Sequence, residues 1–338
     1  MATISWGILG TGRMAATMAV ELRTPPLRQA GAELVAVASR SAASATEFAA
    51  RFGIGRVHGS YAQLAADPRV DAVYIATPPS EHAAHMRLCL EGGKAVLCEK
   101  PFTVDAKEAR TIVELARSRR LFLMEAMWTR FLPAVVTLQD LLRERVIGQP
   151  LLAVGGGAFM PTYEPGYYLF NKELGGGVLL DAGVYLISLC SLLLGSVRRV
   201  QASGELGPQG VDDHEAFILD HEQGARSVLY VSLRTRRPPD LELLGTSGRI
   251  QIHAPIYRPT QLTVNRGFDR NETLELPVVG SGYGNQVLAA MAALRQGKLE
   301  VAELPLDESV AIMSVMDEIG SQLRSAQREP GRLSRGSF

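Results

Sequence analysis

The chain has 338 residues, of which 46% are hydrophobic and 21% are charged. That length and composition are typical of a globular, enzyme-sized protein with about two domains of roughly 150 residues each. Lys plus Arg and Asp plus Glu both number 35. Because the positive and negative charges balance, no net electrostatic field attracts nucleic acid or an anionic membrane. This balance favours an enzyme that acts on small molecules.

The first 125 residues alternate short apolar runs with helical patterns. The runs that predict strands are "ISWGIL", "ELVAVA", "DAVYIA", "AVLC" and "LFLMEA". Between them, apolar residues at helical spacing predict helices over Arg13–Arg23, Ala43–Phe52, Glu81–Glu91 and Ala106–Ser118. This alternation is typical of βαβ units, so we expect an α/β Rossmann domain with a doubly wound parallel sheet.

A glycine turn joins the first strand to the first helix. It has the pattern G-x-G-x-x-A and comprises Gly10, Thr11, Gly12, Arg13, Met14 and Ala15. Gly10 permits a tight turn, Gly12 lets a pyrophosphate approach the backbone, and Ala15 allows the helix to pack closely. The first N–H groups of the helix can then bind phosphate. Its place between a strand and a helix predicts dinucleotide binding rather than a plain structural turn.

The end of the second strand bears on which dinucleotide is bound. NAD-binding sites usually carry an acid there, which holds the ribose hydroxyls, but this chain has Ser39 and Arg40. Arg40 can pair with a 2′-phosphate through its planar guanidinium, and Ser39 can donate its hydroxyl. The alternative is an ordinary solvated arginine after a strand. We favour NADP as the cofactor.

Two further loops follow strands of the predicted sheet. Thr77 and Pro78 come after "AVYIA", and we expect them to line the cofactor because such loops form the ligand crevice. His82 either faces that cleft or only covers the start of a helix. The next strand ends in Glu99 and Lys100. Charges directly after a buried strand are costly unless they meet a ligand or a partner, so we expect both residues to contact the cofactor.

The segment "LGGGVLLDAGVYLISL" places an acid and a phenol at the start of an apolar helix. Asp181 and Tyr185 are four residues apart, so on a helix they share one face. A phenol with its ordinary pKa of about 10 is a poor base at neutral pH. Catalysis by Tyr185 therefore requires a partner from elsewhere in the sequence.

The second half of the chain reads as strands joined by hairpins. The predicted strands are "LLAVGGGAFM", "VRRVQASGEL", "EAFILDH", "ARSVLYVSLR", "DLELLGT", "GRIQIHA", "TQLTVNR" and "ETLELP", with turns at "HEQGA" and "GTSG". We predict an NADP-binding Rossmann domain over residues 1–125. Residues 126–338 are predicted to form a substrate-binding and dimerisation α+β domain with a large open, mainly antiparallel sheet.

Four motifs occur in one characteristic order: the glycine turn, "TPPSEHA", "EGGKAVLCEKP" and "LGGGVLLDAGVY". In their order and spacing, the chain resembles the glucose-fructose oxidoreductase/inositol dehydrogenase/MocA (Gfo/Idh/MocA) family over nearly its whole length. The additional motif "MEAMWTRFLPA" resembles the dihydrodiol dehydrogenase and D-xylose dehydrogenase branch of that family. The lysine motif and the D-x-x-x-Y motif together are fairly specific for the family, but neither specifies a substrate.

The resemblance implies a catalytic pair. In the family, the lysine of the E-K-P motif lies beside the nicotinamide and a residue of the second domain, which is tyrosine in this branch. These residues are Lys100 and Tyr185 here. A nearby cationic lysine favours the phenolate, so Tyr185 would be the general acid for reduction and the general base for oxidation. Asp181 would orient substrate hydroxyls or tune the pair; if Tyr185 is only structural, the base would be Asp181 or His82.

Several side chains near the domain crossing are candidate substrate contacts, because aromatic groups stack on sugar or arene faces: Trp128, Arg130, Phe159 and Tyr163. For Trp128, packing between the domains is an equal alternative. The sequence departs from the family at one point. Many members have Trp-Arg ahead of the triple glycine, whereas this chain has Tyr167 and Tyr168, so the contacts of such an arginine cannot be assumed.

The resemblance leaves three functions open. The leading one is NADP(H)-dependent hydride transfer at a sugar or cyclic-diol carbinol carbon, as in a D-xylose-type aldose 1-dehydrogenase or a trans-dihydrodiol dehydrogenase. The second is an NADPH-dependent 3-keto-sugar reductase of a deoxysugar pathway. The third is an NADPH-binding protein without turnover. A homodimer is expected, because family members commonly pair through the open sheet.

Other chemistry is disfavoured by spacing. The six histidines lack metal-ligand spacing with acids or cysteines, so we expect no metal. Cys89, Cys98 and Cys190 show no disulfide or ligand pattern, which favours a reducing, cytoplasmic location. The opening residues "MATISWGILG" lack the features of an export signal. The longest apolar run, about eleven residues, is too short to span a membrane.

Overall fold

The computed structural model describes residues 2–164, 166–267 and 271–328. The chain forms two compact units. The first contains Met1–Leu138, Arg258–Thr260 and Glu275–Met313, and the second contains Gln139–Tyr257, Gln261–Leu274 and the chain from Ser314. The first unit thus extends past the predicted boundary at residue 125 and includes a later segment that the sequence pattern placed in the second domain.

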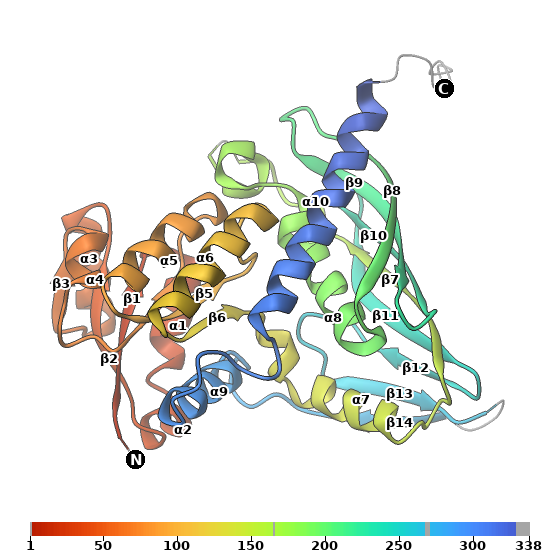
Figure 1. The fold of residues 1–338 in the computed structure, drawn as a ribbon, viewed down its shortest axis with the longest axis horizontal. Coiled ribbons are helices and arrows are strands. Elements are labelled where there is room, and N and C mark those ends of the chain that lie inside the picture. The colour runs from red at the N-terminus through yellow and green to blue at the C-terminus, as the bar shows by residue number, and fades with distance from the viewer. Residues whose placement is uncertain (1, 165, 268–270, 329–338) are drawn as a thin grey trace. The chain divides into compact units, whose positions relative to one another are not determined.

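A six-stranded parallel sheet forms the centre of the first unit (Figure 1). Its strands are β1 (Ile4–Leu9), β2 (Ala32–Ala38), β3 (Arg56–His58), β4 (Ala72–Ile75), β5 (Ala95–Glu99) and β6 (Leu123–Ala126), in the order β3-β2-β1-β4-β5-β6. This order confirms the predicted Rossmann sheet. The sequence did not predict β3, because its three residues are largely exposed and carry no apolar run.

The helices of the first unit form two rows. They are α1 (Arg13–Glu21), α2 (Pro25–Gln29), α3 (Ala42–Phe52), α4 (Tyr61–Ala65), α5 (His82–Glu91), α6 (Ala106–Arg119) and α9 (Gly284–Arg295), with 3-10 turns η1 (Pro79–Glu81) and η2 (Trp128–Phe131). Helix α1 packs with α3, whereas α5 packs with both α4 and α6. Because the sheet grows in opposite directions from β1 and from β4, right-handed crossovers put these rows on opposite faces. The order reverses between β1 and β4, where such sheets bind ligands.

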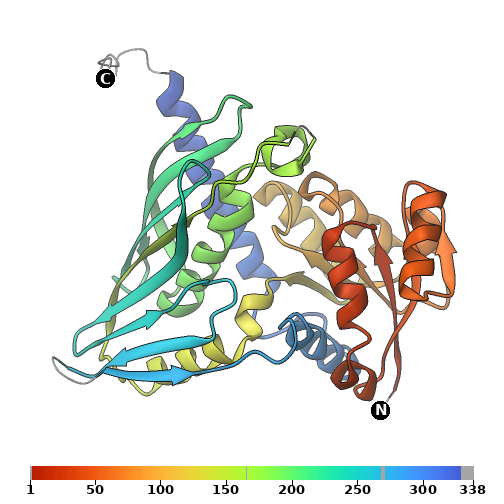
Figure 2. The same cartoon turned by 180° about the vertical axis from the view of Figure 1, so that it is seen from behind.

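The second unit is built on an eight-stranded sheet, seen from behind in Figure 2. Its strands are β7 (Pro150–Ala158), β8 (Val197–Leu206), β9 (Asp212–His221), β10 (Arg226–Ser232), β11 (Arg237–Gly245), β12 (Arg249–Ile252), β13 (Gln261–Asn265) and β14 (Asn271–Glu275), in the order β14-β13-β12-β11-β7-β10-β9-β8. The sheet is mainly antiparallel, as predicted, with a parallel pair, β7 and β10, near its centre. The predicted hairpins at "HEQGA" and "GTSG" join β9 to β10 and β11 to β12.

One face of this sheet is covered by helix α8 (Val184–Leu194), which follows a π-helical segment, η5 (Leu179–Gly183). Two short 3-10 turns, η3 (Tyr168–Phe170) and η4 (Lys172–Leu174), come before it, and α7 (Pro133–Arg143) links the two units along the chain. Helix α10 (Leu306–Arg328) reaches β8 through Gln322, which accepts from Ala202 N at 2.7 Å and donates to Val200 O at 3.0 Å. On the other face, Val154 and Val228 lie in register and are 40% and 39% exposed.

By length and composition, one helical stretch among the described residues, Lys172–Leu194, could cross a membrane. The sequence predicted no such segment, because its longest apolar run is only about eleven residues. The stretch is not one unbroken helix: η4 ends at Leu174, η5 begins at Leu179, and Gly175 and Gly177 between them have positive φ. Of its most apolar window, 61% is buried inside the fold, which is the pattern of a core helix that packs on a sheet.

Candidate active site

The glycine turn after β1 leaves open space where a pyrophosphate is expected. Gly10 has φ +112°, and a Cβ there would lie 2.7 Å from Ala76 O, so only glycine fits this close approach of two strands. A Cβ on Gly12 would meet nothing within 4 Å. Helix α1 has no side-chain cap and no acid in its first turn. Its free N–H groups and the space at Gly12 therefore fit a dinucleotide phosphate.

The other predicted cofactor residues lie at the same edge of the sheet, after β2, β4 and β5. Ser39 is 7% exposed, and Arg40 extends into solvent beyond it. Tyr61, which no sequence motif indicated, accepts a hydrogen bond from the backbone of Arg40. Burial raises the pKa of Tyr61, and this hydrogen bond opposes the rise. Thr77 follows β4, and its hydroxyl lies 3.0 Å from His85 Nδ1. The structure therefore brings together the glycine turn, Arg40, Thr77 and Lys100 along one edge.

His82 is buried and is not exposed at the edge of the sheet where the predicted cofactor residues lie. Its side chain is 1% exposed, with Nδ1 2.8 Å from Pro101 O and Nε2 3.0 Å from Thr77 O. Burial lowers its pKa to about 4. The ring therefore links the loop after β4 to the loop after β5. With both nitrogens facing carbonyl oxygens, His82 is a poor candidate for the alternative general base.

The lysine segment after β5 is held by buried neighbours. The carboxyl group of Glu99 is 5% exposed and accepts a hydrogen bond from the hydroxyl of Tyr74 on β4. Burial raises the pKa of Glu99. Phe102 N donates to Glu125 Oε1 at 3.1 Å. Lys100 is partly exposed between these anchored residues, so its side chain belongs to a rigid part of the crevice edge.

Two of the four predicted substrate contacts are buried within the first unit. Trp128 is 3% exposed and stacks on Tyr283, with ring centroids 4.1 Å apart. Arg130 is 1% exposed; it donates to Glu308 Oε1 at 2.6 Å and to Glu303 O at 3.0 Å. Packing and pairing inside this unit account for both side chains, and their contact with substrate stays a prediction.

The acid and the phenol at the start of α8 each have an aromatic neighbour in the second unit. Asp181 lies in the π-helical segment, where Tyr168 donates its hydroxyl to Asp181 Oδ1 at 2.5 Å. Tyr185 is in the first turn of α8, and its ring centroid is 5.9 Å from that of Tyr257. Tyr168 stands at the position where the sequence departs from the family, so the departure supplies a partner for Asp181. Nothing in the sequence indicated Tyr257, which comes from the loop after β12.

The remaining predicted substrate residues also lie in the second unit. Phe159 follows β7 and is half-buried, whereas Tyr163 is 53% exposed and packs edgewise on Phe170 at 5.1 Å. Lys100 belongs to the first unit and Tyr185 to the second, and the pairing of their side chains stays a prediction. Among the described residues, no group of three or more His, Cys, Asp or Glu is arranged to hold a metal ion.

Two family models match the chain along most of its length. The model described as "Oxidoreductase family, NAD-binding Rossmann fold" matches residues 4–127, and the "GFO/IDH/MocA C-terminal domain" matches residues 135–251. The chain belongs to the GFO/IDH/MocA family. Membership confirms the resemblance drawn from the four motifs, and it makes the chain an NAD(P)-dependent oxidoreductase.

Curated GFO/IDH/MocA relatives include sugar and dihydrodiol dehydrogenases. The chain is 35% identical to D-xylose 1-dehydrogenase (NADP(+)) of Hypocrea jecorina, covering 94% of this chain and 91% of that protein. It is also 35% identical to trans-1,2-dihydrobenzene-1,2-diol dehydrogenase of Mus musculus, covering 93% and 95%. Both belong to the branch that the "MEAMWTRFLPA" motif indicated.

Solved structures of two other proteins share the whole fold of this chain. KijD10, a 3-ketoreductase from Actinomadura kijaniata solved with NADP and TDP-benzene, is 28% identical with a TM-score of 0.82, covering 95% of this chain and 98% of that one. Levoglucosan dehydrogenase in complex with NADH and levoglucosan has a TM-score of 0.87, covering 96% and 98%, but only 21% identity. That second likeness shows the fold alone.

Proposed function

We propose that the chain is an NADP(H)-dependent dehydrogenase that acts on a carbinol carbon of a sugar or a cyclic diol. The observation that carries the proposal is the edge of the first sheet. There, the uncapped helix that follows β1, with open space at Gly12, and Lys100, which follows β5, lie at the same edge of the sheet with β4 between their strands. The two dehydrogenases at 35% identity support the substrate class.

The cofactor would be held by the glycine turn, by Ser39 and Arg40, and by the loop at Thr77 and Pro78, with Glu99 and Lys100 at its nicotinamide end. Arg40 is exposed at the end of β2 and can form a charge-assisted pair with a 2′-phosphate. Bound NADP(H) supplies the hydride acceptor or donor. The choice of NADP over NAD rests on Arg40, on the missing acid in that loop, and on the NADP named for two relatives.

The protein side of the reaction is a proton transfer at the substrate oxygen. Tyr185 takes this proton during oxidation and returns it during reduction, and the positive charge of Lys100 favours the phenolate that can do so. Asp181 holds a substrate hydroxyl, with its carboxylate oriented by Tyr168. Tyr257, beside Tyr185, offers an exposed aromatic face for the substrate ring.

A substrate screen tests the proposal. Purified protein is incubated with NADP and a panel of aldoses, D-xylose included, and cyclic trans-diols, and NADPH formation is followed at 340 nm. We expect turnover with at least one of these two classes, and slower turnover with NAD. Absence of turnover across both classes, with tight NADPH binding intact, would rule out this dehydrogenase activity and leave a 3-keto-sugar reductase or a binding protein without turnover.

A 3-keto-sugar reductase is the second candidate, favoured by the likeness to KijD10 at 28% identity. Solved forms of that reductase include one with a lysine replaced by alanine and one with a tyrosine replaced by phenylalanine. Reduction of a nucleotide-linked 3-keto sugar by NADPH, without oxidation of free aldoses or diols, would favour this candidate over the first.

The proposed enzyme works as a cytoplasmic homodimer on a small molecule, without nucleic acid or membrane. All three cysteines are buried and free, as is usual in a reducing compartment. The exposed valines of β7 and β10 offer an apolar sheet face to a second copy.

A further inference from the structure

The segment around Lys100 is held by buried polar side chains from three other elements, two of which bind its backbone. His82 of α5 contacts Pro101 O, and Glu125 of β6 accepts from Phe102 N. Tyr74 of β4 donates to the carboxyl group of Glu99. Residues 99, 101 and 102 are thus each held by one side chain, and all of these contacts lie within the first unit.

Burial of the Glu125 carboxyl group is costly. Its side chain is 1% exposed, and burial raises its pKa to about 7 against the opposing effects of Ser309 and Arg130. An apolar side chain of similar size would avoid this desolvation cost. The carboxylate instead accepts two hydrogen bonds, from Phe102 N and from Ser309 Oγ at 2.7 Å. It therefore ties the backbone after Lys100 to the start of α10.

His82 binds the same backbone from the other side of β5. It begins helix α5, which follows β4, whereas Glu125 is on β6. A neutral imidazole has one N–H, and burial keeps this ring neutral near pH 7. Its two nitrogens face Pro101 O and Thr77 O, so the ring donates to one carbonyl at a time while it spans both loops. The loop that lines the cofactor and the loop that carries the lysine are joined through this one side chain.

We propose that Glu125, together with His82, is a positioning residue that fixes Lys100 for proton transfer. The proposal rests on the proposed function, in which Lys100 assists Tyr185. The geometry supports positioning because both side chains bind backbone within two residues of the lysine. Displacing a catalytic group by about 1 Å can cost roughly 100-fold in rate. A lost anchor is therefore expected to lower kcat more than cofactor affinity.

Three variants of the anchor separate positioning from packing. Glu125→Gln keeps a carbonyl oxygen that can accept from Phe102 N, whereas Glu125→Leu removes the acceptor at similar volume. Ser309→Ala removes only the second hydrogen bond, and it serves if the leucine variant does not fold. We expect kcat within about threefold of wild type for the glutamine variant, and a loss of about 10- to 100-fold for the leucine variant. NADPH affinity is expected to change less than about threefold.

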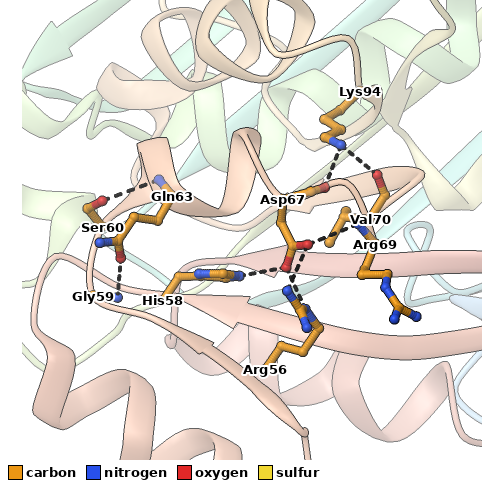
Figure 3. Close-up of polar contacts among 9 residues, drawn as sticks. All are labelled: Arg56, His58, Gly59, Ser60, Gln63, Asp67, Arg69, Val70 and Lys94. Carbon is orange, nitrogen blue, oxygen red and sulfur yellow. Dashed lines mark hydrogen bonds and ion pairs between the residues drawn. The ribbon is translucent and has the colours of Figure 1, made fainter.

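Asp67→Asn is the matched control. Asp67 is also a buried carboxylate of the first unit, 3% exposed, and also accepts from a backbone N–H, that of Arg69 at 2.9 Å. It contacts Arg56 and His58 of the edge strand β3 (Figure 3). Strands β3 and β6 are the two outer strands of the sheet. We expect this variant to melt at a lower temperature with unchanged kcat. Equal melting losses in Glu125→Leu and Asp67→Asn, with kcat unchanged in both, would overturn the proposal.

A second measurement does not depend on turnover. Competitive labelling with acetic anhydride, read by mass spectrometry of the Lys100 peptide between pH 7 and 10, reports the reactivity of its amine. We expect Glu125→Leu, or Ser309→Ala to a smaller degree, to change this reactivity by roughly threefold or more, and Asp67→Asn to leave it unchanged. An unchanged profile in both anchor variants overturns the positioning role. A changed profile together with full activity of Lys100→Met overturns the proposed function and leaves the anchor standing.

Discussion

Glu215 is a buried acid without a hydrogen-bond partner among the described residues. Its side chain is 2% exposed on the covered face of β9. Burial, with the neighbouring carboxyl groups Asp212 and Asp213, raises its pKa from 4.5 to about 9. At neutral pH the folded chain therefore holds a proton that the unfolded chain has released. The free energy of unfolding falls as pH rises from about 4.5 towards 9.

Glu215→Gln should remove this pH dependence, because the amide resembles the protonated acid and cannot ionise. We expect the variant to melt at a higher temperature than wild type. The gain of the variant in the free energy of unfolding should grow from pH 5 to pH 8, by up to about 1.4 kcal/mol per pH unit. Thermal unfolding at both pH values, with exposed Glu222→Gln as control, gives the comparison. A gain that stays constant with pH would mean that Glu215 is already ionised in the folded chain.

Arg40 is the residue on which the choice of cofactor depends. Arg40→Ala removes one charge-assisted contact to a 2′-phosphate, so NADPH is expected to bind about 10- to 100-fold more weakly, from a loss of about 1.5–3 kcal/mol. NADH has no 2′-phosphate, and its affinity is expected to stay the same. Fluorescence titration with both cofactors measures this, with exposed Arg51→Ala of α3 as control. Equal NADPH affinities in wild type and Arg40→Ala would contradict the assignment.

At the scale of elements, a polar cluster centred on Asp67 joins the edge strand β3 to the segment after α4 (Figure 3). The guanidinium of Arg56 lies 2.6 Å from Asp67 Oδ2, and His58 Nε2 lies 2.9 Å from the same oxygen. Lys94 donates to the carbonyl oxygens of Asp67 and Val70. The side-chain hydrogen bond from Arg56 is the main effect that holds the pKa of Asp67 well below its usual range.

Asp67→Asn should therefore destabilise the first unit in a pH-dependent way. A depressed carboxyl pKa stabilises the folded chain at pH values above the ordinary value near 4, and this contribution is lost as pH falls through the folded pKa. We expect a loss of about 1–2 kcal/mol at pH 7, moderate because Arg56 is half-exposed. Urea unfolding at pH 7 and pH 3 measures the loss. A loss at pH 3 as large as that at pH 7 would contradict the ionic explanation.

The elements differ in how well the sequence predicts them. The sequence pattern placed β1, β8 and α6 within one or two residues. Strand β1 is an apolar run that is almost wholly buried, and β8 alternates exposed and partly buried residues over most of its length. Helix α6 buries its apolar residues at helical spacing. The pattern cannot show the π-helical segment before α8, since a five-residue change of helix type leaves the apolar spacing almost unchanged.

The candidate site divides in the same way. Gly10, Gly12, Arg40 and Lys100 were predictable because each follows a strand in a known pattern. The contacts of Tyr168 with Asp181 and of Glu125 with Phe102 join residues 13 and 23 positions apart. Only the tertiary fold specifies such contacts, so the sequence could not indicate them.

At the scale of the whole molecule, the open face of the second sheet predicts a homodimer. Val154 and Val228 are adjacent on β7 and β10 and both exposed, so Val228→Asp places a charge in the apolar interface. We expect wild type to have twice the 36.5 kDa mass of one chain at micromolar concentration in light scattering, and the variant to have the single mass. Val57→Asp, at a similarly exposed valine of β3, should remain dimeric. A monomeric wild type would refute the prediction.

The most direct test of the account is the pH profile of oxidation in Tyr185→Phe. If Tyr185 transfers the proton and Lys100 assists it, the variant should lose about 10²–10⁴-fold in kcat, keep its NADPH affinity, and lose the limb of the profile that reports the phenol. Lys100→Met should be at least as damaging. The double variant should lose little more, because both residues serve one step. A Tyr185→Phe enzyme with near-normal kcat and an unchanged profile would contradict the account, and the base would then be sought at Asp181.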